Sequence, residues 1–334
     1  MFMLSKRYNE RNGIMGLLIN GIWYDTSQQS VENQQKVEKD KLKFRNWITK
    51  DGSSGPSGVS GFKAERNRYH LYVSYACPWA SRALIMRKLK GLEDMISISV
   101  VNPYMGENGW TFEADQDVIS DPVIDADYLH QIYTQDSPDY SGKVTVPVLY
   151  DKKQLRIVSN ESSEIIRMFN SAFDGVGATK GNYVKESLVP EINKWNEIIS
   201  EKVNIGVYKA GFATNQKTYN EHVHSLFDVL DKLEKHLESH RFLIGNEPTE
   251  ADWRLFPTLI RFDIVYFGHF KCNLKRLIDY KNLWHYTKEL YNWSGVSETV
   301  NFRHIKEHYY RSHTNINPTG IIPEGPILNL TINN

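Results

Sequence analysis

Residues 69–82 read Tyr69-His-Leu-Tyr-Val-Ser-Tyr-Ala-Cys-Pro-Trp-Ala-Ser-Arg82, and their pattern changes halfway along. The apolar and aromatic residues of 69–74 favour a β-strand. Over residues 79–90 the apolar side chains recur at helical spacing instead. Because proline is favoured in the first turn of a helix, Pro78 places Cys77 at the N-cap. This stretch therefore predicts a strand that leads through a cysteine into a helix.

The sequence on the C-terminal side extends this unit. Residues 96–101 alternate between apolar and polar side chains and predict a second strand. The runs 146–150 and 154–158 predict a hairpin, and residues 161–170 predict a helix after it. The order strand, helix, strand, insertion, hairpin, helix indicates an α/β arrangement with one parallel crossover.

Beyond about residue 180 the strand signals disappear. Pro190 begins an amphipathic helix, and residues 223–237 follow helical spacing. Thr249 and Asp252 resemble a capping box, and two further helices are expected at 283–293 and 294–310. The predicted division is an N-terminal extension and loop (1–61), an α/β domain (62–172), an all-helical domain (180–313) and a C-terminal tail (314–334).

Length and composition limit the classes of function. The 334 residues are enough for about two domains of ordinary size. The 40 basic and 40 acidic residues balance, so no overall positive field attracts nucleic acid or anionic lipid. Two cysteines are too few for a disulfide framework, and no apolar run reaches the ~20 residues of a membrane-spanning helix. We expect a cytoplasmic protein with no nucleic-acid or membrane partner.

Cys77 is the first candidate for chemistry. Free N–H groups and the dipole at a helix N-terminus favour the thiolate and can lower a cysteine pKa below its usual ~8.5. The alternative is a small buried residue that caps the helix. Because residue 80 is Ala80, there is no Cys-x-x-Cys pair, and a reactive Cys77 needs an outside thiol to resolve it. Cys272, in the predicted helical domain, is interpreted as a packing residue.

Two further segments point to a ligand near Cys77. Val146-Pro147 enters a strand where thioredoxin-like folds carry a cis-proline, whose preceding backbone groups face the cysteine and can pair with a peptide-like ligand. Glu161-Ser162-Ser163 opens a helix, where a carboxylate and free N–H groups can hold the charged ends of an amino-acid ligand. An ordinary helix cap explains Glu161 and Ser162 about as well.

At these residues the sequence resembles the glutathione transferase superfamily, and more closely its Xi class, the glutathionyl-hydroquinone reductases. The resemblance runs from about Trp23 to His313. The motifs that carry it are Tyr75-Ala-Cys-Pro-Trp-Ala-Ser-Arg82, Met105-Gly-Glu-Asn-Gly-Trp-Thr-Phe112, Val144-Thr-Val-Pro-Val-Leu149, Asn160-Glu-Ser-Ser-Glu-Ile-Ile166, Val207-Tyr-Lys-Ala-Gly-Phe-Ala213, Arg261-Phe-Asp-Ile-Val-Tyr-Phe-Gly-His-Phe-Lys-Cys272 and His308-Tyr-Tyr-Arg-Ser-His313. A Cys-Pro-x-Ala motif alone also fits Omega-class enzymes, whereas the full set in this order does not.

The resemblance implies a thioredoxin-like N-terminal domain followed by an all-helical glutathione-transferase domain, in a homodimer that forms through the helical domain. It implies glutathione as co-substrate, no metal, and Cys77 as the catalytic nucleophile. The expected glutathione contacts are Trp110, Lys143, Val146, Pro147, Glu161 and Ser162. The expected tyrosines of the second-substrate pocket are Tyr208, Tyr309 and, with a weaker motif match, Tyr266.

The implied reaction removes glutathione from a glutathionyl-hydroquinone in two half-steps. The Cys77 thiolate attacks the glutathione sulfur, which releases the hydroquinone and leaves a mixed disulfide. A second glutathione attacks that disulfide and leaves as oxidised glutathione. A phenol can donate a hydrogen bond to a quinol oxygen, so we hypothesise that the Tyr208 or Tyr309 hydroxyl assists protonation of the leaving aromatic.

Three other readings compete. His304-Ile-Lys-Glu-His308 matches the His-x-x-Glu-His pattern of inverted zinc peptidases, but packing histidines are favoured because the reductase motifs explain this segment without a metal. The second is an Omega-type thioltransferase or dehydroascorbate reductase, against which Trp110 and the tyrosine-rich motifs argue. The third is a non-catalytic transferase-like interaction module, which the complete Cys77 motif disfavours.

Overall fold

The central sheet is built around the strand that precedes Cys77. The structure, a computed structural model, describes residues 16–25, 44–58 and 60–332. Its four-stranded sheet has the order β6-β5-β8-β9. All five residues of β5 (Tyr69–Val73) are buried, and β6 (Ile96–Val100) pairs with it in parallel. Helix α2 (Pro78–Leu89) joins these two strands, because parallel neighbours need a crossover connection.

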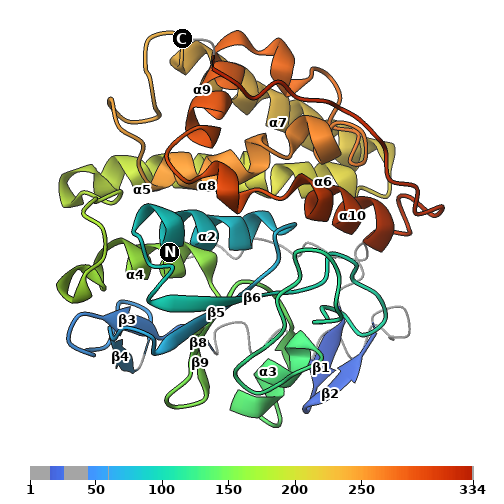
Figure 1. Cartoon of the computed structure of the whole chain (residues 1–334). Coiled ribbons are helices and arrows are strands. Elements are labelled where there is room, and N and C mark those ends of the chain that lie inside the picture. The colour runs from blue at the N-terminus through green and yellow to red at the C-terminus, as the bar shows by residue number, and fades with distance from the viewer. Residues whose placement is uncertain (1–15, 26–43, 59, 333–334) are drawn as a thin grey trace, which may run out of the picture.

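The hairpin β8 (Val148–Asp151) and β9 (Arg156–Ser159) completes the sheet, with β8 antiparallel to both β5 and β9. Helices α2 and α4 (Ser162–Ser171) pack together between the sheet and the helical part (Figure 1). Helix α3 (Leu129–Asp136) contacts β9 on the side away from the helical part. The sheet is therefore covered by helices, which agrees with its buried strands.

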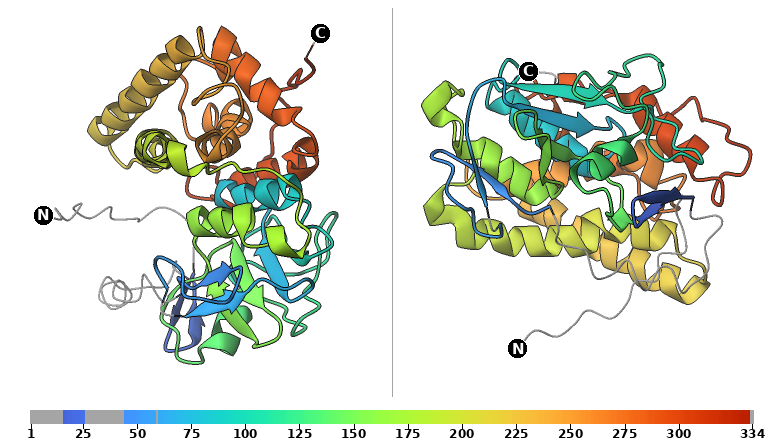
Figure 2. Two further views of the ribbon diagram at one scale, coloured as in Figure 1. Left: turned by 90° about the vertical axis from the view of Figure 1, so that its left-hand side faces the viewer. Right: turned by 90° about the horizontal axis from the view of Figure 1, so that it is seen from below.

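The helical part follows the sheet and forms a second lobe, as Figure 2 shows. Helix α2 contacts α8 across the boundary between the lobes. None of the helices in the described part of the chain is long and apolar enough to cross a membrane. The elements are η3 (Asp174–Val176), η4 (Glu186–Leu188), α5 (Val189–Ile198), the π-helix η5 (Ile199–Asn204), α6 (Gly206–Gly211), α7 (Gln216–His236), α8 (Glu250–Leu259), the π-helix η6 (Phe262–Tyr266), η7 (Leu277–Asp279), α9 (Lys281–Tyr291), η8 (Ser297–Thr299) and α10 (Phe302–Ser312).

The predicted α/β part followed by a helical part is confirmed. Cys77 is the N-cap of α2, with Pro78 in the first turn. The capping box at α8 is also present, since the Asp252 carboxylate accepts hydrogen bonds from the Thr249 backbone N–H at 2.7 Å and hydroxyl at 2.9 Å. The domain boundaries given above stay predictions.

The segment before residue 61, predicted as an N-terminal extension and loop, contains short strands that the sequence analysis did not identify. Strand β1 (Leu17–Ile19) pairs with β2 (Ile22–Tyr24) and with β7 (Gly142–Lys143). Strand β3 (Trp47–Thr49) pairs in parallel with β4 (Gly61–Lys63). Strands β1 and β2 form a hairpin that turns at Asn20-Gly21, both with positive φ, which is a local hairpin signal that the sequence analysis overlooked. The pairing of β1 with β7 has no local signal, because β7 is distant in sequence. The rest of the predicted extension lies outside the described residues.

The predicted helix at 294–310 is broken. Gly295 has a φ of +79°, and Val300 and Asn301 are extended, so α10 begins only at Phe302. The Asn301 side chain caps α10 by accepting a hydrogen bond from the His304 N–H at 2.9 Å. Apolar spacing alone did not reveal this break, because the residues on either side of it keep a helical pattern. Helix α3, in the predicted insertion, was also missed.

Candidate active site

Cys77 lies where strand β5 turns into helix α2. Its backbone is extended, and its Sγ lies 3.6 Å from the carbonyl oxygen of Val146, to which the thiol can donate. The Val146–Pro147 peptide bond is cis, as predicted. The structure thus brings the Cys-Pro and Val-Pro segments, which are far apart in sequence, to one place.

The electrostatics at Cys77 differ from the sequence expectation. Burial raises the pKa of the Cys77 thiol. The backbone N–H groups of Trp79 and Ala80 act in the opposite direction, and so do the charges of Arg261 and Arg82. The helix N-terminus therefore favours the thiolate as expected, but desolvation of the sulfur outweighs it.

The start of α4 lies against α2. Glu161 is the N-cap of α4, and its carboxylate accepts hydrogen bonds from the Ser163 N–H at 2.9 Å and hydroxyl at 2.8 Å. Ser162 is buried, and its hydroxyl lies 3.4 Å from the Arg82 guanidinium. Arg82 also donates to Asn204 at 2.8 Å and lies over the Trp79 ring at 4.4 Å. Glu161 acts as an ordinary helix cap here, and its charge also acts on Arg82 of α2.

Trp110 and Lys143 occupy different surroundings. Trp110 is buried and stacks on His308 of α10, with ring centroids 4.8 Å apart. Burial lowers the pKa of His308 to about 4, so its ring is neutral at pH 7. Its Nδ1 lies 3.0 Å from the Pro103 carbonyl, which ties α10 to the loop before Trp110. Lys143 is an exposed residue of β7, three positions before Val146.

The three tyrosines singled out from the sequence come together. Tyr309 of α10 is in the middle: its hydroxyl lies 2.5 Å from that of Tyr208 (α6) and 3.0 Å from that of Tyr266 (η6). Burial raises the pKa of all three, and the charge of Cys77 further raises those of Tyr208 and Tyr266. The tyrosine cluster therefore lies beside Cys77, and its hydroxyls stay protonated at neutral pH.

Aromatic side chains enclose the tyrosine cluster. Phe270 packs on all three tyrosines, with centroid distances of 5.3–5.6 Å. Cys272 is buried behind them, with its Sγ 3.9 Å from the Val207 carbonyl, and burial raises its pKa to about 12. These contacts match the interpretation of Cys272 as a packing residue.

Arg261 received no role from the sequence, although it opens one of the quoted motifs. It is fully buried at the end of α8 and donates to the carbonyls of Tyr75 and Ala76, the two residues before Cys77. Arginine is common in helical segments, so nothing in the local sequence distinguishes this one. Only the fold places it at the Cys77 turn.

The histidines of the His-x-x-Glu-His string point to separate places. His304 Nε2 lies 2.8 Å from the Gln116 carbonyl, whereas His308 is bound to the Pro103 carbonyl. Glu307 accepts a hydrogen bond from Arg303 at 2.8 Å. Within the described residues no three His, Cys, Asp or Glu side chains are grouped as metal ligands. Both histidines attach α10 to the α/β part, which accords with packing roles.

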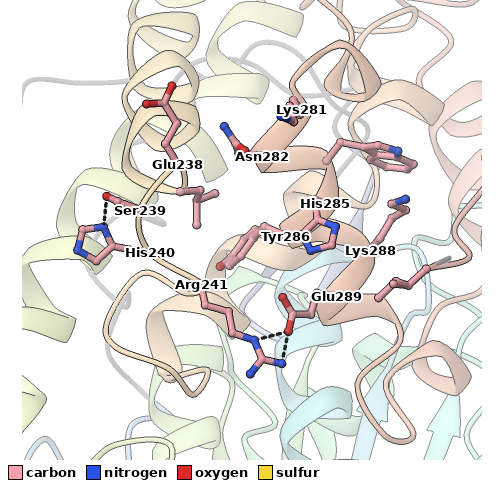
Figure 3. Close-up of a pocket in the computed structure, with 13 residues that line it drawn as sticks. Glu238, Ser239, His240, Arg241, Lys281, Asn282, His285, Tyr286, Lys288 and Glu289 are labelled. Atoms are coloured by element: carbon pink, nitrogen blue, oxygen red, sulfur yellow. Dashed lines mark hydrogen bonds and ion pairs between the residues drawn. The ribbon is translucent and has the colours of Figure 1, made fainter. Parts of the chain in front are cut away.

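An open hollow lies away from Cys77. It is an open depression of about 910 Å³ between the end of α7 and helix α9, shown in Figure 3. Its lining includes the Arg241–Glu289 ion pair, Lys281 and His285. None of the predicted site residues lines it, so we place the candidate site at Cys77 on chemical grounds.

Comparison with known proteins identifies the family of the chain. Residues 76–172 match the model of the glutathione S-transferase N-terminal domain, and residues 216–289 match that of the C-terminal domain. The chain is 55% identical over 313 residues to the glutathionyl-hydroquinone reductase YqjG of Escherichia coli, covering 93% of this chain and 95% of YqjG. It is 51% identical over 312 residues to the glutathionyl-hydroquinone reductase PcpF of Sphingobium chlorophenolicum, covering 93% and 96%.

Solved structures agree. The glutathione-bound structure of Escherichia coli YqjG superposes with a TM-score of 0.87 at 53% identity, covering 94% of this chain and 97% of that one. The Xi-class transferase of Natrialba magadii superposes with a TM-score of 0.88 at 42% identity, covering 97% of each chain. These matches cover nearly the whole chain, so they include both the α/β part and the helical part. The chain therefore belongs to the glutathionyl-hydroquinone reductase family, the Xi class of the glutathione S-transferases.

Proposed function

We propose that this protein removes glutathione from glutathionyl-hydroquinones and releases the free hydroquinones, with glutathione as co-substrate and Cys77 as the nucleophile. The observation that carries the proposal is the meeting of three features in one place. Cys77 caps α2, the Val146 carbonyl lies 3.6 Å from its sulfur, and the charge of Cys77 acts on Tyr208 and Tyr266 of the tyrosine cluster. The similarity to two glutathionyl-hydroquinone reductases supports the same activity.

In the first half-step the Cys77 thiolate attacks the glutathione sulfur of the substrate. A sulfur–sulfur bond forms, the sulfur–aryl bond breaks, and the aromatic leaves with the electron pair of that bond. A proton delivered to the leaving aromatic then completes the hydroquinone. The tyrosine cluster supports this step, because its hydroxyls remain protonated and able to donate.

In the second half-step a glutathione thiolate attacks the mixed disulfide. It forms oxidised glutathione and releases Cys77 as the thiolate. An outside thiol is required because position 80 of this chain is alanine, so α2 holds no second cysteine. Cys272 is buried behind the tyrosines and is not available to resolve the disulfide.

We further propose a glutathione site formed by two segments, the Val146–Pro147 peptide and the start of α4. Backbone groups of Val146, before Pro147, pair with the peptide-like part of glutathione, and the start of α4 at Glu161 and Ser162 binds its γ-glutamyl end. Lys143 pairs with a glutathione carboxylate, and Trp110 packs over the ligand. The lysine supplies charge without the planar fork of an arginine.

The first test is Cys77→Ala. We expect this variant to lose hydroquinone release entirely and to show no glutathione adduct in the intact mass after incubation with substrate. Cys272→Ala is the matched control, and it should retain both activity and adduct because its thiol takes no part. Turnover by Cys77→Ala at the wild-type rate would exclude the mechanism.

The proposal also includes the oligomeric state, the cellular location and the domain bounds. We expect a homodimer that forms through the helical part, an activity located in the cytoplasm, and no bound metal. We retain 62–172 and 180–313 as the bounds of the two domains. The enzyme-class assignment does not depend on these statements.

A further inference from the structure

Arg261 connects the helical part to the turn that carries Cys77. It lies between α8 and η6 and has no exposed surface. Its Nε donates to the Ala76 carbonyl at 3.0 Å, and one Nη donates to the Tyr75 carbonyl at 2.9 Å. Its other Nη donates to the Pro257 carbonyl at 2.8 Å, within its own helical segment. One planar guanidinium thus holds both residues that precede the nucleophile.

All three acceptors of Arg261 are neutral. The guanidinium makes no ion pair with a carboxylate of the described residues, although a buried cation without a counter-charge is costly. Arg82, the other cation near Cys77, likewise donates only to neutral acceptors, namely the Ser162 hydroxyl, the Asn204 side-chain oxygen and the Arg254 carbonyl. Arg261 is distinguished by its place, because its guanidinium donates to the carbonyls of the two residues directly before Cys77.

Besides Arg261 itself, the titratable groups that interact electrostatically with Cys77 come from three elements. They are Arg82 of α2, Tyr208 of α6 and Tyr266 of η6. The positive charge of Arg261 lowers the pKa of Cys77 and of Tyr266. Because burial keeps both tyrosines protonated, a thiolate at Cys77 is the anion that forms beside Arg261.

We propose that Arg261 is a positioning residue for the reaction: it fixes the Tyr75–Ala76 turn from the helical part and supplies the buried positive charge that favours the Cys77 thiolate. This inference rests on the proposed function, because it takes Cys77 as the nucleophile. It also gives the helical part a role in the first chemical event, beyond lining the pocket for the second substrate.

The test measures the alkylation of Cys77 by iodoacetamide as a function of pH, followed by mass spectrometry of the peptide that contains Cys77. We expect Arg261→Met to move the midpoint of the alkylation rate against pH upward by about one pH unit. Below the midpoint, Cys77 of this variant should therefore be alkylated about tenfold more slowly than in the wild type. Arg87→Met is the matched control, since Arg87 also donates to backbone carbonyls, but to those of Ile96 at 2.7 Å and Glu93 at 3.1 Å and not to those before Cys77. Its midpoint should equal that of the wild type.

A folded Arg261→Met variant with the wild-type midpoint would overturn the proposal. Arg261→Lys is measured in parallel and decides the matter if Arg261→Met does not fold. It keeps the charge but loses the planar fork, so we expect the wild-type midpoint with about tenfold lower turnover. Wild-type turnover in Arg261→Lys would contradict the positioning role. Alkylation needs no hydroquinone, so the alkylation midpoints do not depend on whether Cys77→Ala confirms the proposed reaction, whereas the turnover of Arg261→Lys does.

Discussion

Tyr309 is the central residue of the tyrosine cluster. Its hydroxyl lies within hydrogen-bond distance of two others, those of Tyr208 and Tyr266, and a phenol has one proton to donate. The three hydroxyls therefore form a chain in which at least one proton can be redirected toward a bound aromatic. A chain of this kind beside the Cys77 sulfur is suited to protonate the leaving group as the sulfur–aryl bond breaks.

We predict that Tyr309→Phe slows the first half-step by roughly 100-fold, because general acid catalysis contributes on this scale. Reduction of a preformed Cys77–glutathione disulfide should proceed at the wild-type rate, since that step needs no aromatic leaving group. Rapid-mixing measurements of each half-step separate the two effects.

Tyr280→Phe is the matched control for Tyr309→Phe. Tyr280 is also buried, and its hydroxyl donates to Asp231 of α7 at 2.8 Å, outside the tyrosine cluster. Both half-steps should be unchanged in this variant. Equal slowing of the two half-steps in Tyr309→Phe would show that the tyrosine organises the site and does not transfer a proton.

Helix α10 holds several parts of the site together. It carries Tyr309 of the tyrosine cluster, His308 that stacks on Trp110, and His304 that bonds the Gln116 carbonyl. The Ser312 hydroxyl at its end accepts from the Met105 N–H at 2.9 Å. The position of this helix therefore sets the distance between Trp110 and the tyrosines.

We predict that Asn301→Ala destabilises the protein by about 1 kcal/mol, the usual effect of losing a helix N-cap. The side chain of Asn301 also donates to Asp117 at 2.8 Å, so its loss loosens the contact of α10 with the α/β part. The first half-step should slow along with the stability loss. Urea denaturation and single-turnover kinetics measure the two effects.

Asn215→Ala provides the comparison for this prediction. Asn215 caps α7 by accepting from the Thr218 N–H at 3.0 Å, and α7 carries none of the proposed site residues. A similar loss of stability is expected, with wild-type kinetics. If both variants slowed the first half-step equally, α10 would have no special role.

At the scale of the whole molecule, a buried carboxylate joins the two lobes. Glu250, at the start of α8, has no exposed surface. It accepts from Arg167 of α4 at 2.7 Å, from Asn196 of α5 at 2.9 Å and from Arg254 of α8 at 3.1 Å. Arg82 adds a second link, through Asn204 of η5. Polar contacts of this kind set one orientation of the lobes, because apolar packing has little directionality.

We predict that Glu250→Gln lowers the free energy of unfolding by about 3 kcal/mol, the lower end of the range for breaking a buried ion pair, since Arg167 is partly exposed. Glu289→Gln is the control. It breaks the pair with the exposed Arg241, for which less than about 1 kcal/mol is expected. Urea unfolding of both variants tests the difference, and equal losses would contradict a special role for Glu250.

Local patterns sufficed to predict several particular features. Pro78 after Cys77 predicted the N-cap, because proline fits the first turn of a helix irrespective of its surroundings. The spacing of 223–237 predicted most of α7, and Thr249 with Asp252 predicted the start of α8. The hairpin of β1 and β2 was overlooked although Asn20-Gly21 marks its turn, and β3 was missed because three residues are too few for a clear alternating pattern. The break at Val300 depends on backbone torsions that apolar spacing does not reveal.

The sequence by itself determined the nucleophile candidate, its lack of a resolving cysteine at Ala80, and the motifs that mark the family, since these are properties of residue type and spacing. Only the tertiary structure decided what surrounds Cys77. Burial, which depends on every packed neighbour, raised the thiol pKa where the helix N-terminus alone predicted a lower one. The same packing brought Tyr208, Tyr266 and Tyr309 from three helices to one point, and placed Arg261 on the carbonyls before the nucleophile. Spatial proximity and desolvation arise from the whole fold, so no local pattern encodes them.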